Sequence, residues 1–146
     1  MKKTLAFLML MLASQMAIAD FLWPKGNDLT AKIHSATAWE NMLYDAEKTE
    51  AILSNNDSMI LKLNFKKDRR DVVLEIWGDS YNCHRQDMQG HKDMYICPKP
   101  DYRIQINLYQ RFRVITGVQI NIAPWEDQWG GMFEPFRIGL EASITK

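Results

Sequence analysis

The feature that most constrains the fold is a strict alternation of apolar and polar residues. This period of two runs through residues 102–109, 112–122 and 136–144. Successive side chains of a strand point to opposite faces, so each segment has one buried and one solvated face. Parallel strands covered on both faces would instead give continuous apolar runs, and these segments have no helical crossovers between them. The pattern therefore predicts an antiparallel sheet.

Other segments add strands to this sheet. Residues 58–65 and 72–78 flank the polar stretch Lys-Lys-Asp-Arg-Arg-Asp at 66–71 and predict a hairpin. Residues 94–97 predict a further short strand, and Gly117 predicts a bend or bulge within its strand. Together these segments indicate a meander of about five or six strands.

Residues 37–55 predict the helix of the chain. Thr37 and Glu40 have the spacing of a capping box, in which each side chain satisfies the other's backbone amide. Five apolar residues recur at helical spacing and predict a core-facing stripe: Trp39, Met42, Leu43, Ala46 and Leu53. Residues 29–35 fit either a short strand or a first helical turn.

The predicted fold class is therefore α+β. We expect the N-terminal helix to pack on the apolar face of an antiparallel, meander-like sheet of about five or six strands. The alternative is a strongly curved sheet or a partial barrel, in which the same alternating strands bend around their apolar face. Both alternatives place residues 20–146 in a single domain.

The first nineteen residues predict export. Lys2 and Lys3 precede an apolar run that ends in Ala-Ile-Ala before Asp20, which is the pattern of a cleaved signal peptide at residues 1–19. The apolar run is shorter than the roughly 20 residues that span a bilayer, so we expect no stable membrane insertion after cleavage. The short positive region is typical of bacteria and predicts a periplasmic or secreted protein.

The charge balance of the mature chain limits its partners. Cleavage removes two of the eighteen Lys and Arg residues and none of the eighteen Asp and Glu residues, which leaves sixteen against eighteen and a net charge of −2. A general nucleic-acid binder needs a concentrated basic surface. The sequence therefore predicts no nucleic-acid partner.

The two cysteines, Cys83 and Cys97, predict one disulfide, because paired cysteines in an exported chain oxidise. Four soft or borderline metal ligands lie between them: His84, Met88, His91 and Met94. Imidazole and thioether groups together suit copper, chiefly Cu(I). However, a disulfide sulfur is no thiolate ligand, and the spacing matches no specific metal motif. The favoured prediction is a loop closed by a disulfide, with no metal and no cofactor.

Catalytic patterns are absent from the sequence. It contains no Gly-x-Ser-x-Gly elbow, no His-Glu-x-x-His pair and no glycine-rich phosphate loop, and only three histidines. Glu126 and Asp127 are adjacent acids, whereas glycoside hydrolysis needs two carboxylates set across a cleft. The sequence therefore predicts a protein that is not an enzyme.

The connection at 123–136 is the favoured binding segment. It is long for a hairpin loop and rich in large aromatic groups, which dominate binding hot spots. The candidate partner-binding residues are Trp125, Glu126, Asp127, Trp129 and Phe133. The acidic residues among them suit a basic protein partner. The alternative is that the aromatic side chains pack over one end of the sheet.

The predicted function is thus an exported, non-enzymatic binding protein of the inhibitor or immunity type, whose partner is another protein. Two alternatives remain open. One is periplasmic copper binding or sensing through the loop at 83–97. The other is a small-ligand carrier that uses the concave face of the sheet.

Overall fold

The computed structural model describes residues 28–56, 59–66, 69–86, 94–112, 114–125 and 134–145. The expected signal peptide at 1–19 lies outside these residues. The strands are β1 (Asp28–Glu40), β2 (Leu43–Tyr44), β3 (Ile60–Phe65), β4 (Asp71–Ile76), β5 (Asp79–Arg85), β6 (Met94–Pro98), β7 (Tyr102–Arg111), β8 (Val114–Pro124) and β9 (Phe136–Ile144). Within the described ranges one helix, α2 (Ala46–Ser54), lies between β2 and β3.

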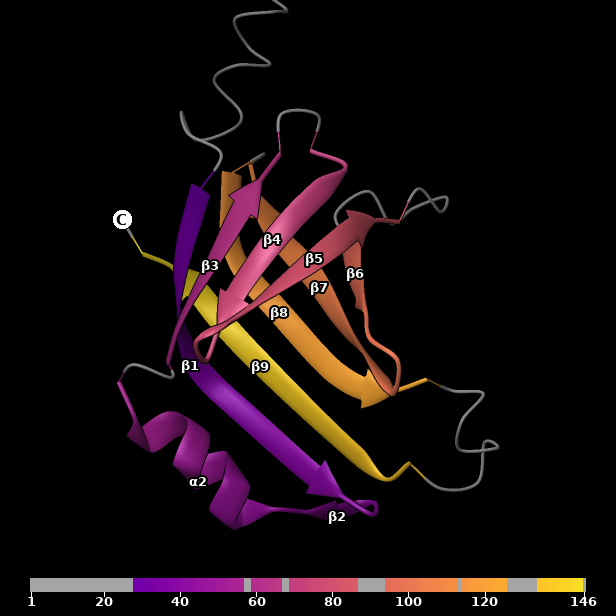
Figure 1. Cartoon of the computed structure of the whole chain (residues 1–146). Helices are drawn as coiled ribbons and strands as arrows, with labels where there is room; N and C mark the ends of the chain where they lie inside the picture. The colour runs from indigo at the N-terminus through magenta and orange to yellow at the C-terminus, as the bar shows by residue number, and fades with distance from the viewer. Residues whose placement is uncertain are drawn as a thin grey trace, which may run out of the picture.

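The strands close into a barrel. From β3 to β9 each strand pairs antiparallel with the next, and β1 pairs antiparallel with both β3 and β9. The ring β1-β3-β4-β5-β6-β7-β8-β9 therefore contains eight strands, and of the strands in the described residues only the two-residue β2 lies outside it (Figure 1). The predicted α+β fold, a helix on an open sheet, is wrong. The alternative of a curved sheet or partial barrel also stops short of this closure.

The strand β1 explains the error in fold class. Leu29, Ala31 and Ile33 point into the barrel, but the register with β9 shifts between Ile33 and Ser35. A bulge of this kind moves the following side chains to the opposite parity. The inward positions then continue at small alanines such as Ala38, which is completely buried. Because the alternation is broken, the thirteen-residue strand was not predicted: residues 29–35 were left open between strand and helical turn, and residues 37–40 were predicted to be helix.

The strand β5 was not predicted, because only a two-residue turn separates it from β4. The predicted strand at 72–78 ends at Ile76, and Trp77 and Gly78 form a two-residue connection because Ile76 pairs with Asp79. Their φ angles are 55° and 82°, as a type I′ hairpin turn requires. The other predicted strands correspond to β3, β6, β7, β8 and β9. The register of β7 with β8 shifts beside Gly117, where the sequence predicted a bend or bulge.

The barrel interior is filled by side chains. An eight-stranded barrel is just wide enough for inward side chains to meet at its axis. The largest fully buried side chains are Tyr95, Ile33, Leu61, Leu63, Leu74, Ile76, Ile104, Ile106, Ile120, Leu140, Val72 and Val118. Every strand of the ring except β5 contributes to this set, and β5 adds the buried Cys83.

The helix α2 is shorter than predicted and begins later. Its N-cap is Asp45, whose side chain accepts a hydrogen bond from the Lys48 amide at 2.9 Å. The predicted capping box of Thr37 and Glu40 is wrong, because both residues belong to β1. No helix in the described part of the chain has the length and apolar character needed to cross a membrane.

The helix covers the part of the β1 edge that lies between its pairings with β3 and with β2. β1 pairs with β3 only over Asp28–Lys32, so its second half needs another partner on that side. The Ala38 amide donates to Thr49 Oγ1 at 3.0 Å, and the Asp45 amide donates to the Ala38 carbonyl at 2.8 Å. Ile52 extends from the helix into the core. In Figure 1, α2 lies alongside this half of β1.

We expect Thr49→Val to lower the free energy of unfolding by about 1–3 kcal/mol, because it leaves the buried Ala38 amide without an acceptor. Thr49 Oγ1 also donates to the Asp45 carbonyl at 2.7 Å, so the substitution removes two hydrogen bonds. Thr49→Ser is the matched control, since it keeps the hydroxyl and loses one methyl group. Urea unfolding measures both, and equal losses would contradict this role of the hydroxyl.

Candidate binding surface at the lower end of the barrel

The two ends of the barrel carry different turns. The β1–β2 turn and the start of β9 lie at the bottom of Figure 1, which we call the lower end, and the β4–β5 and β6–β7 turns face the same way but lie higher in the view. The β3–β4 and β7–β8 turns lie at the upper end. This division follows from the meander, in which consecutive strands run in opposite directions. Each end therefore gathers residues from distant parts of the chain.

The lower end exposes an apolar hairpin tip. This tip comprises Trp39, Met42, Leu43 and Tyr44, whose exposed fractions are 41%, 60%, 73% and 53%. The rings of Trp39 and Tyr44 meet edge to face, with their centroids 5.7 Å apart. The prediction that Trp39, Met42 and Leu43 form a buried helical stripe is wrong. They lie on a hairpin that extends beyond the packed interior.

The backbone of the hairpin tip is strained. Glu40 pairs with Leu43, so Asn41 and Met42 form a two-residue turn, with φ angles of 49° and 64°. Asparagine tolerates such angles, but a side chain like that of methionine costs about 1–2 kcal/mol there. Met42 is thus exposed at a cost in stability. Strained positions of this kind cluster at binding and catalytic sites.

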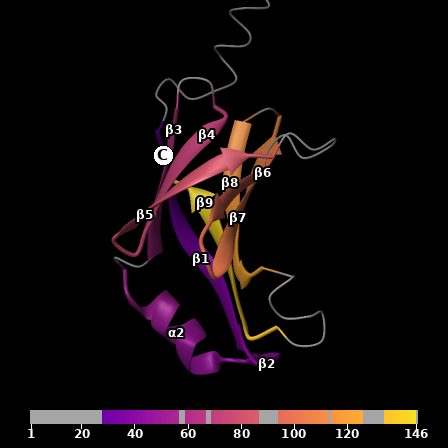
Figure 2. The ribbon, with the colours of Figure 1, turned by 45° about the vertical axis from the view of Figure 1, so that its right-hand side comes forward.

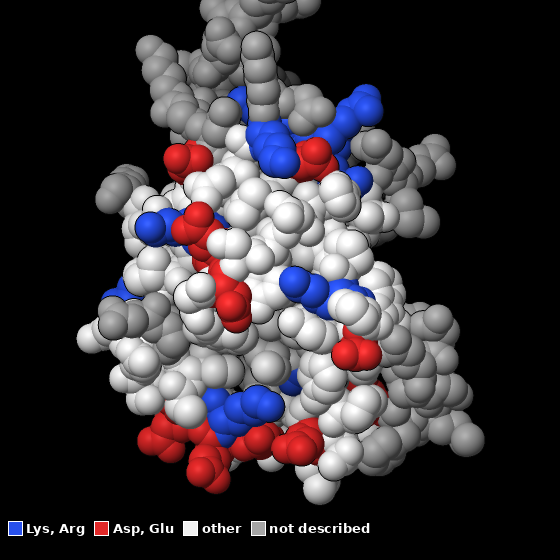
Figure 3. Space-filling model, in the orientation of Figure 1, with Lys and Arg blue, Asp and Glu red and all other residues white. Residues whose placement is uncertain are grey.

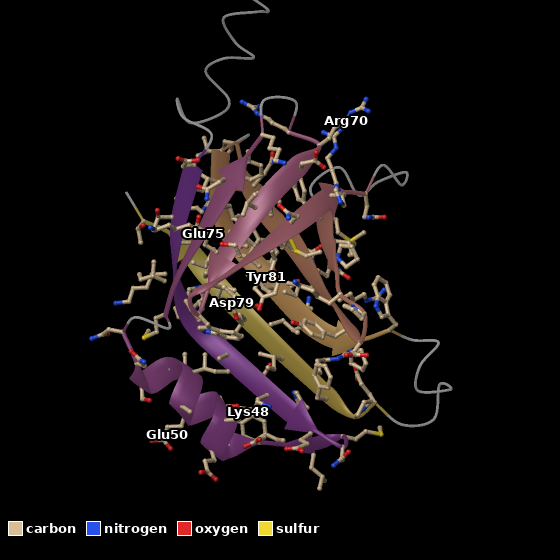
Figure 4. The ribbon with its side chains drawn as sticks, viewed as in Figure 1. Lys48, Glu50, Arg70, Glu75, Asp79 and Tyr81 are labelled. Carbon is tan, nitrogen blue, oxygen red and sulfur yellow. A yellow bond between two sulfur atoms is a disulfide. The ribbon has the colours of Figure 1, made fainter. Side chains whose placement is uncertain are left out.

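Carboxylates lie on one side of the hairpin tip, at the end of β1 and along α2. This acidic rim comprises Glu40, Asp45, Glu47 and Glu50, which come from the end of β1 and from the first turns of α2. Figure 3 shows acidic side chains gathered at the lower edge, whereas Lys and Arg gather near the top. Lys48 is the basic residue within the rim (Figure 4). The lower end therefore combines apolar and acidic groups.

The predicted partner-binding loop begins and ends at this same end. Trp125, which is half-buried, donates from Nε1 to the Lys99 carbonyl at 2.8 Å, and the Arg103 guanidinium lies 5.8 Å from its ring centroid. At the other end of the loop, the Asn41 amide donates to the Pro135 carbonyl at 2.8 Å. The remaining candidates lie outside the described residues: Glu126, Asp127, Trp129 and Phe133. Their role stays a prediction.

The predicted disulfide is present. Cys83 on β5 and Cys97 on β6 are bonded, and both are buried in the core. His84 pairs with Ile96 in the register of these adjacent strands, so Cys83 and Cys97 lie opposite each other on neighbouring strands. The disulfide joins the two strands on either side of the connection at 86–93.

The metal-ligand candidates are only partly described. His84 is exposed, and its Nδ1 lies 2.6 Å from Asp71 Oδ1 on the neighbouring strand. Met94 is half-buried on β6, and Met88 and His91 lie outside the described residues. Among the residues that are described, no three His, Cys, Asp or Glu side chains are grouped to hold a metal ion.

A small apolar cavity opens beside the hairpin tip. This mouth cavity has a volume of about 120 Å³. It is lined by Ile76, Trp77, Tyr81, Tyr102, Ile104, Ile122, Phe136 and Ile138. Burial, together with a hydrogen bond to Tyr102, raises the pKa of Tyr81 to about 12. The Tyr81 hydroxyl therefore stays neutral well into the alkaline range.

The fold and this surface define an eight-stranded antiparallel β-barrel with a filled interior and a candidate binding surface at one end. Comparison of the chain with protein-family models, with curated proteins and with solved structures gave no significant match.

Proposed function

We propose that this chain is an exported, non-enzymatic binding protein that recognises another protein through the lower end of its barrel. The observation that carries the proposal is the exposed apolar hairpin tip on a strained turn within the acidic rim. The partner presents an apolar patch bordered by basic residues. A rigid barrel of this size suits an inhibitor or immunity protein, which blocks its partner by occupying a functional surface.

The composition of the hairpin tip supports recognition of a protein. Aromatic residues and methionine are enriched at interfaces, and tryptophan and tyrosine dominate their hot spots. Trp39, Met42 and Tyr44 provide these residue types on one hairpin. Contiguous exposed apolar groups rimmed by polar residues mark interaction sites in soluble proteins. The acidic rim adds charge complementarity, which chiefly increases association rate and specificity.

The Cys83–Cys97 disulfide is consistent with a location outside the cytoplasm. Together with the predicted signal peptide, it supports a periplasmic or secreted protein of a bacterium. The partner would meet the lower end in that compartment.

The two alternative functions gain less support from the described residues. A small-ligand carrier needs a pocket of about 300–1,000 Å³. The mouth cavity is about 120 Å³, a pocket at the β4–β5 turn lined by Lys62, Glu75 and Asp79 is about 250 Å³, and the barrel interior is packed with side chains. Copper binding through residues 83–97 would have to proceed without the two thiols, which form the disulfide. Protein recognition is therefore the function that the surface supports best.

The experiment that identifies the partner is site-specific photo-crosslinking in the native compartment. A benzophenone amino acid replaces Leu43 at the lower end or, as the matched control, Phe112, which is 89% exposed at the upper end. We expect a discrete adduct from position 43 and none from position 112. The cross-linked protein is identified by mass spectrometry and purified for affinity measurements.

We expect Leu43→Asp to weaken the affinity for the purified partner by at least about thirtyfold, which corresponds to about 2 kcal/mol. Leu43 is exposed, so its replacement should change the free energy of unfolding by less than about 0.5 kcal/mol. Phe112→Asp should leave the affinity unchanged. Calorimetric titration measures all three proteins. An unchanged affinity in Leu43→Asp would refute recognition through the lower end.

A further inference from the structure

We propose that the mouth cavity receives one apolar side chain of the partner, of the size of leucine or phenylalanine and flanked by basic residues. This inference rests on the proposed function and adds the chemistry of the group that the partner inserts. Phe136 of the cavity pairs with Glu40, which pairs in turn with Leu43 of the hairpin tip, so one partner surface would contact both the cavity and Leu43. The hairpin tip would provide a surface contact, and the cavity would fix the position of the inserted group.

The shape of the barrel wall creates the cavity. β4 and β5 turn back at Trp77 and Gly78, whereas β8 and β9 continue further toward the lower end (Figures 1 and 2). Ile76 and Trp77 therefore line one side of the space. Ile122 on β8 and Ile138 on β9 line the other. The cavity thus lies where the wall is uneven, between five strands that are otherwise packed.

The size of the cavity selects a single group. An apolar cavity of about 150 Å³ in a protein interior stays dry and binds benzene. The mouth cavity, at about 120 Å³, is slightly smaller and is lined almost entirely by aliphatic and aromatic side chains. It is too small for a ligand of several rings, but it matches one aliphatic or aromatic side chain. Hot-spot residues fill desolvated pockets of this kind at protein interfaces.

The aromatic edge of the cavity is preorganised. The rings of Tyr102 and Phe136 meet edge to face, with centroids 6.4 Å apart. Tyr81 is held by Lys99, whose Nζ lies 4.7 Å from the ring centroid, and its hydroxyl donates to Asp79 Oδ2 at 3.4 Å. Figure 4 shows Asp79 and Tyr81 at the β4–β5 turn. A group that enters the cavity would therefore meet ring faces and edges held in place by their own contacts.

The register of β9 connects the cavity to the acidic rim. Phe136, at the cavity, pairs directly with Glu40 of the hairpin, and Trp39 pairs with Arg137. A side chain inserted beside Phe136 thus brings its neighbours close to Glu40. Carboxylates at that position favour lysine or arginine on the partner. For this reason we expect the inserted apolar residue to be flanked by basic ones.

Two peptides test the inference without knowledge of the partner. The probe is acetyl-Lys-Lys-Phe-Lys-Lys-amide, and the control replaces its phenylalanine by alanine. Titrations are followed through the isoleucine methyl signals of the protein by NMR. We expect the phenylalanine peptide to shift the signals of Ile122 and Ile138 and to bind at least about tenfold more tightly than the alanine peptide. The signal of Ile144, near the upper end of β9, should stay unchanged.

A matched pair of variants locates the site. Ile138→Trp fills the cavity, whereas Ile144→Trp makes the same change on the same strand near the opposite end; both isoleucines are half-buried. We expect Ile138→Trp to weaken binding of the phenylalanine peptide at least about tenfold, and Ile144→Trp to change it less than about twofold. If Ile138→Trp does not fold, Ile138→Phe is the smaller filling change.

Equal binding of the two peptides, or equal binding by the two variants, would overturn the inference. Titration of the purified partner separates this outcome from failure of the proposed function. If Leu43→Asp weakens partner binding and Ile138→Trp does not, the cavity is no part of the interface and the proposed function stands. If both weaken it, the inference is supported.

Discussion

Replacement of Tyr95 by alanine should lower the free energy of unfolding by about 3–5 kcal/mol, as for other large aromatic groups removed from a core. Tyr95 is 1% exposed and is one of the largest fully buried side chains. Its ring meets that of Phe65 edge to face, with centroids 5.8 Å apart, and its hydroxyl donates to the Arg69 carbonyl at 3.0 Å. The residue therefore joins the short strand β6 to the core and to the β3–β4 turn.

Tyr95→Phe is the control that separates packing from hydrogen bonding. It keeps the ring and removes only the hydroxyl, so we expect a loss of about 1 kcal/mol. Chemical denaturation monitored by circular dichroism measures both variants. Similar losses in Tyr95→Phe and Tyr95→Ala would show that the hydrogen bond, and not the buried ring, dominates at this position.

Replacement of both cysteines, Cys83→Ala with Cys97→Ala, should cost about 3 kcal/mol. The estimate follows from the chain-entropy model for a closed loop of about 15 residues, since the bonded cysteines are separated by 14 positions. The disulfide restricts the unfolded chain, and its loss leaves that chain more entropy to lose on folding. Both side chains are buried, so alanine avoids the added burial of polar groups.

A reductant provides the control for the cysteine variant. Reduction of the native protein should lower its stability by a similar amount, whereas the double variant should not respond to the reductant. Denaturant unfolding of the native protein and of the double variant, each with and without reductant, gives the four free energies of unfolding to be compared. A native protein whose stability is insensitive to complete reduction would contradict a stabilising role. Because Tyr95 and Cys97 lie two positions apart on β6, the losses from both sites need not add.

The changes at Tyr95 lie away from the lower end, where the proposed binding surface lies, because Tyr95 contacts the β3–β4 turn at the upper end. The disulfide is closer to that surface, since Cys83 Sγ lies 3.4 Å from the carbonyl of Tyr81, which lines the mouth cavity. A protein destabilised at Tyr95 should bind its partner with unchanged affinity at temperatures where it remains folded. Loss of affinity in Leu43→Asp would then reflect the surface itself and not the stability of the barrel.

The local pattern of the sequence was sufficient for most of the strands and for the disulfide. The strands β7, β8 and β9 mostly alternate because each has one face in the core and one in water, although the alternation of β8 shifts at the consecutive buried residues Gly117 and Val118. The bulge beside Gly117 and the pairing of the two cysteines were also predictable. In each case the determining feature lies within a short segment, or has only one possible partner.

The closure of the barrel was decided by tertiary structure. The closing contact pairs β1 with β9, and its register joins residues as distant as Ala38 and Ile138. No local pattern encodes such a pairing. The spacing of the apolar residues in 37–55 fits a helix almost as well as it fits a strand followed by a turn. Pairing of β1 with β9 favours the strand, so the helix begins only after Asp45.

The same competition concealed the candidate binding surface. Trp39, Met42 and Leu43 fit the apolar stripe of a helix, and a stripe of that kind is buried. Once β1 is a strand, the chain reverses at Asn41 and Met42, and these side chains project beyond the packed interior. The sequence alone predicted a protein partner for the aromatic and acidic residues of 125–133, and it did not predict an exposed hairpin tip at 39–44. Which aromatic groups are exposed depended on the closure of the barrel, because burial is set by distant strands and not by neighbours along the chain.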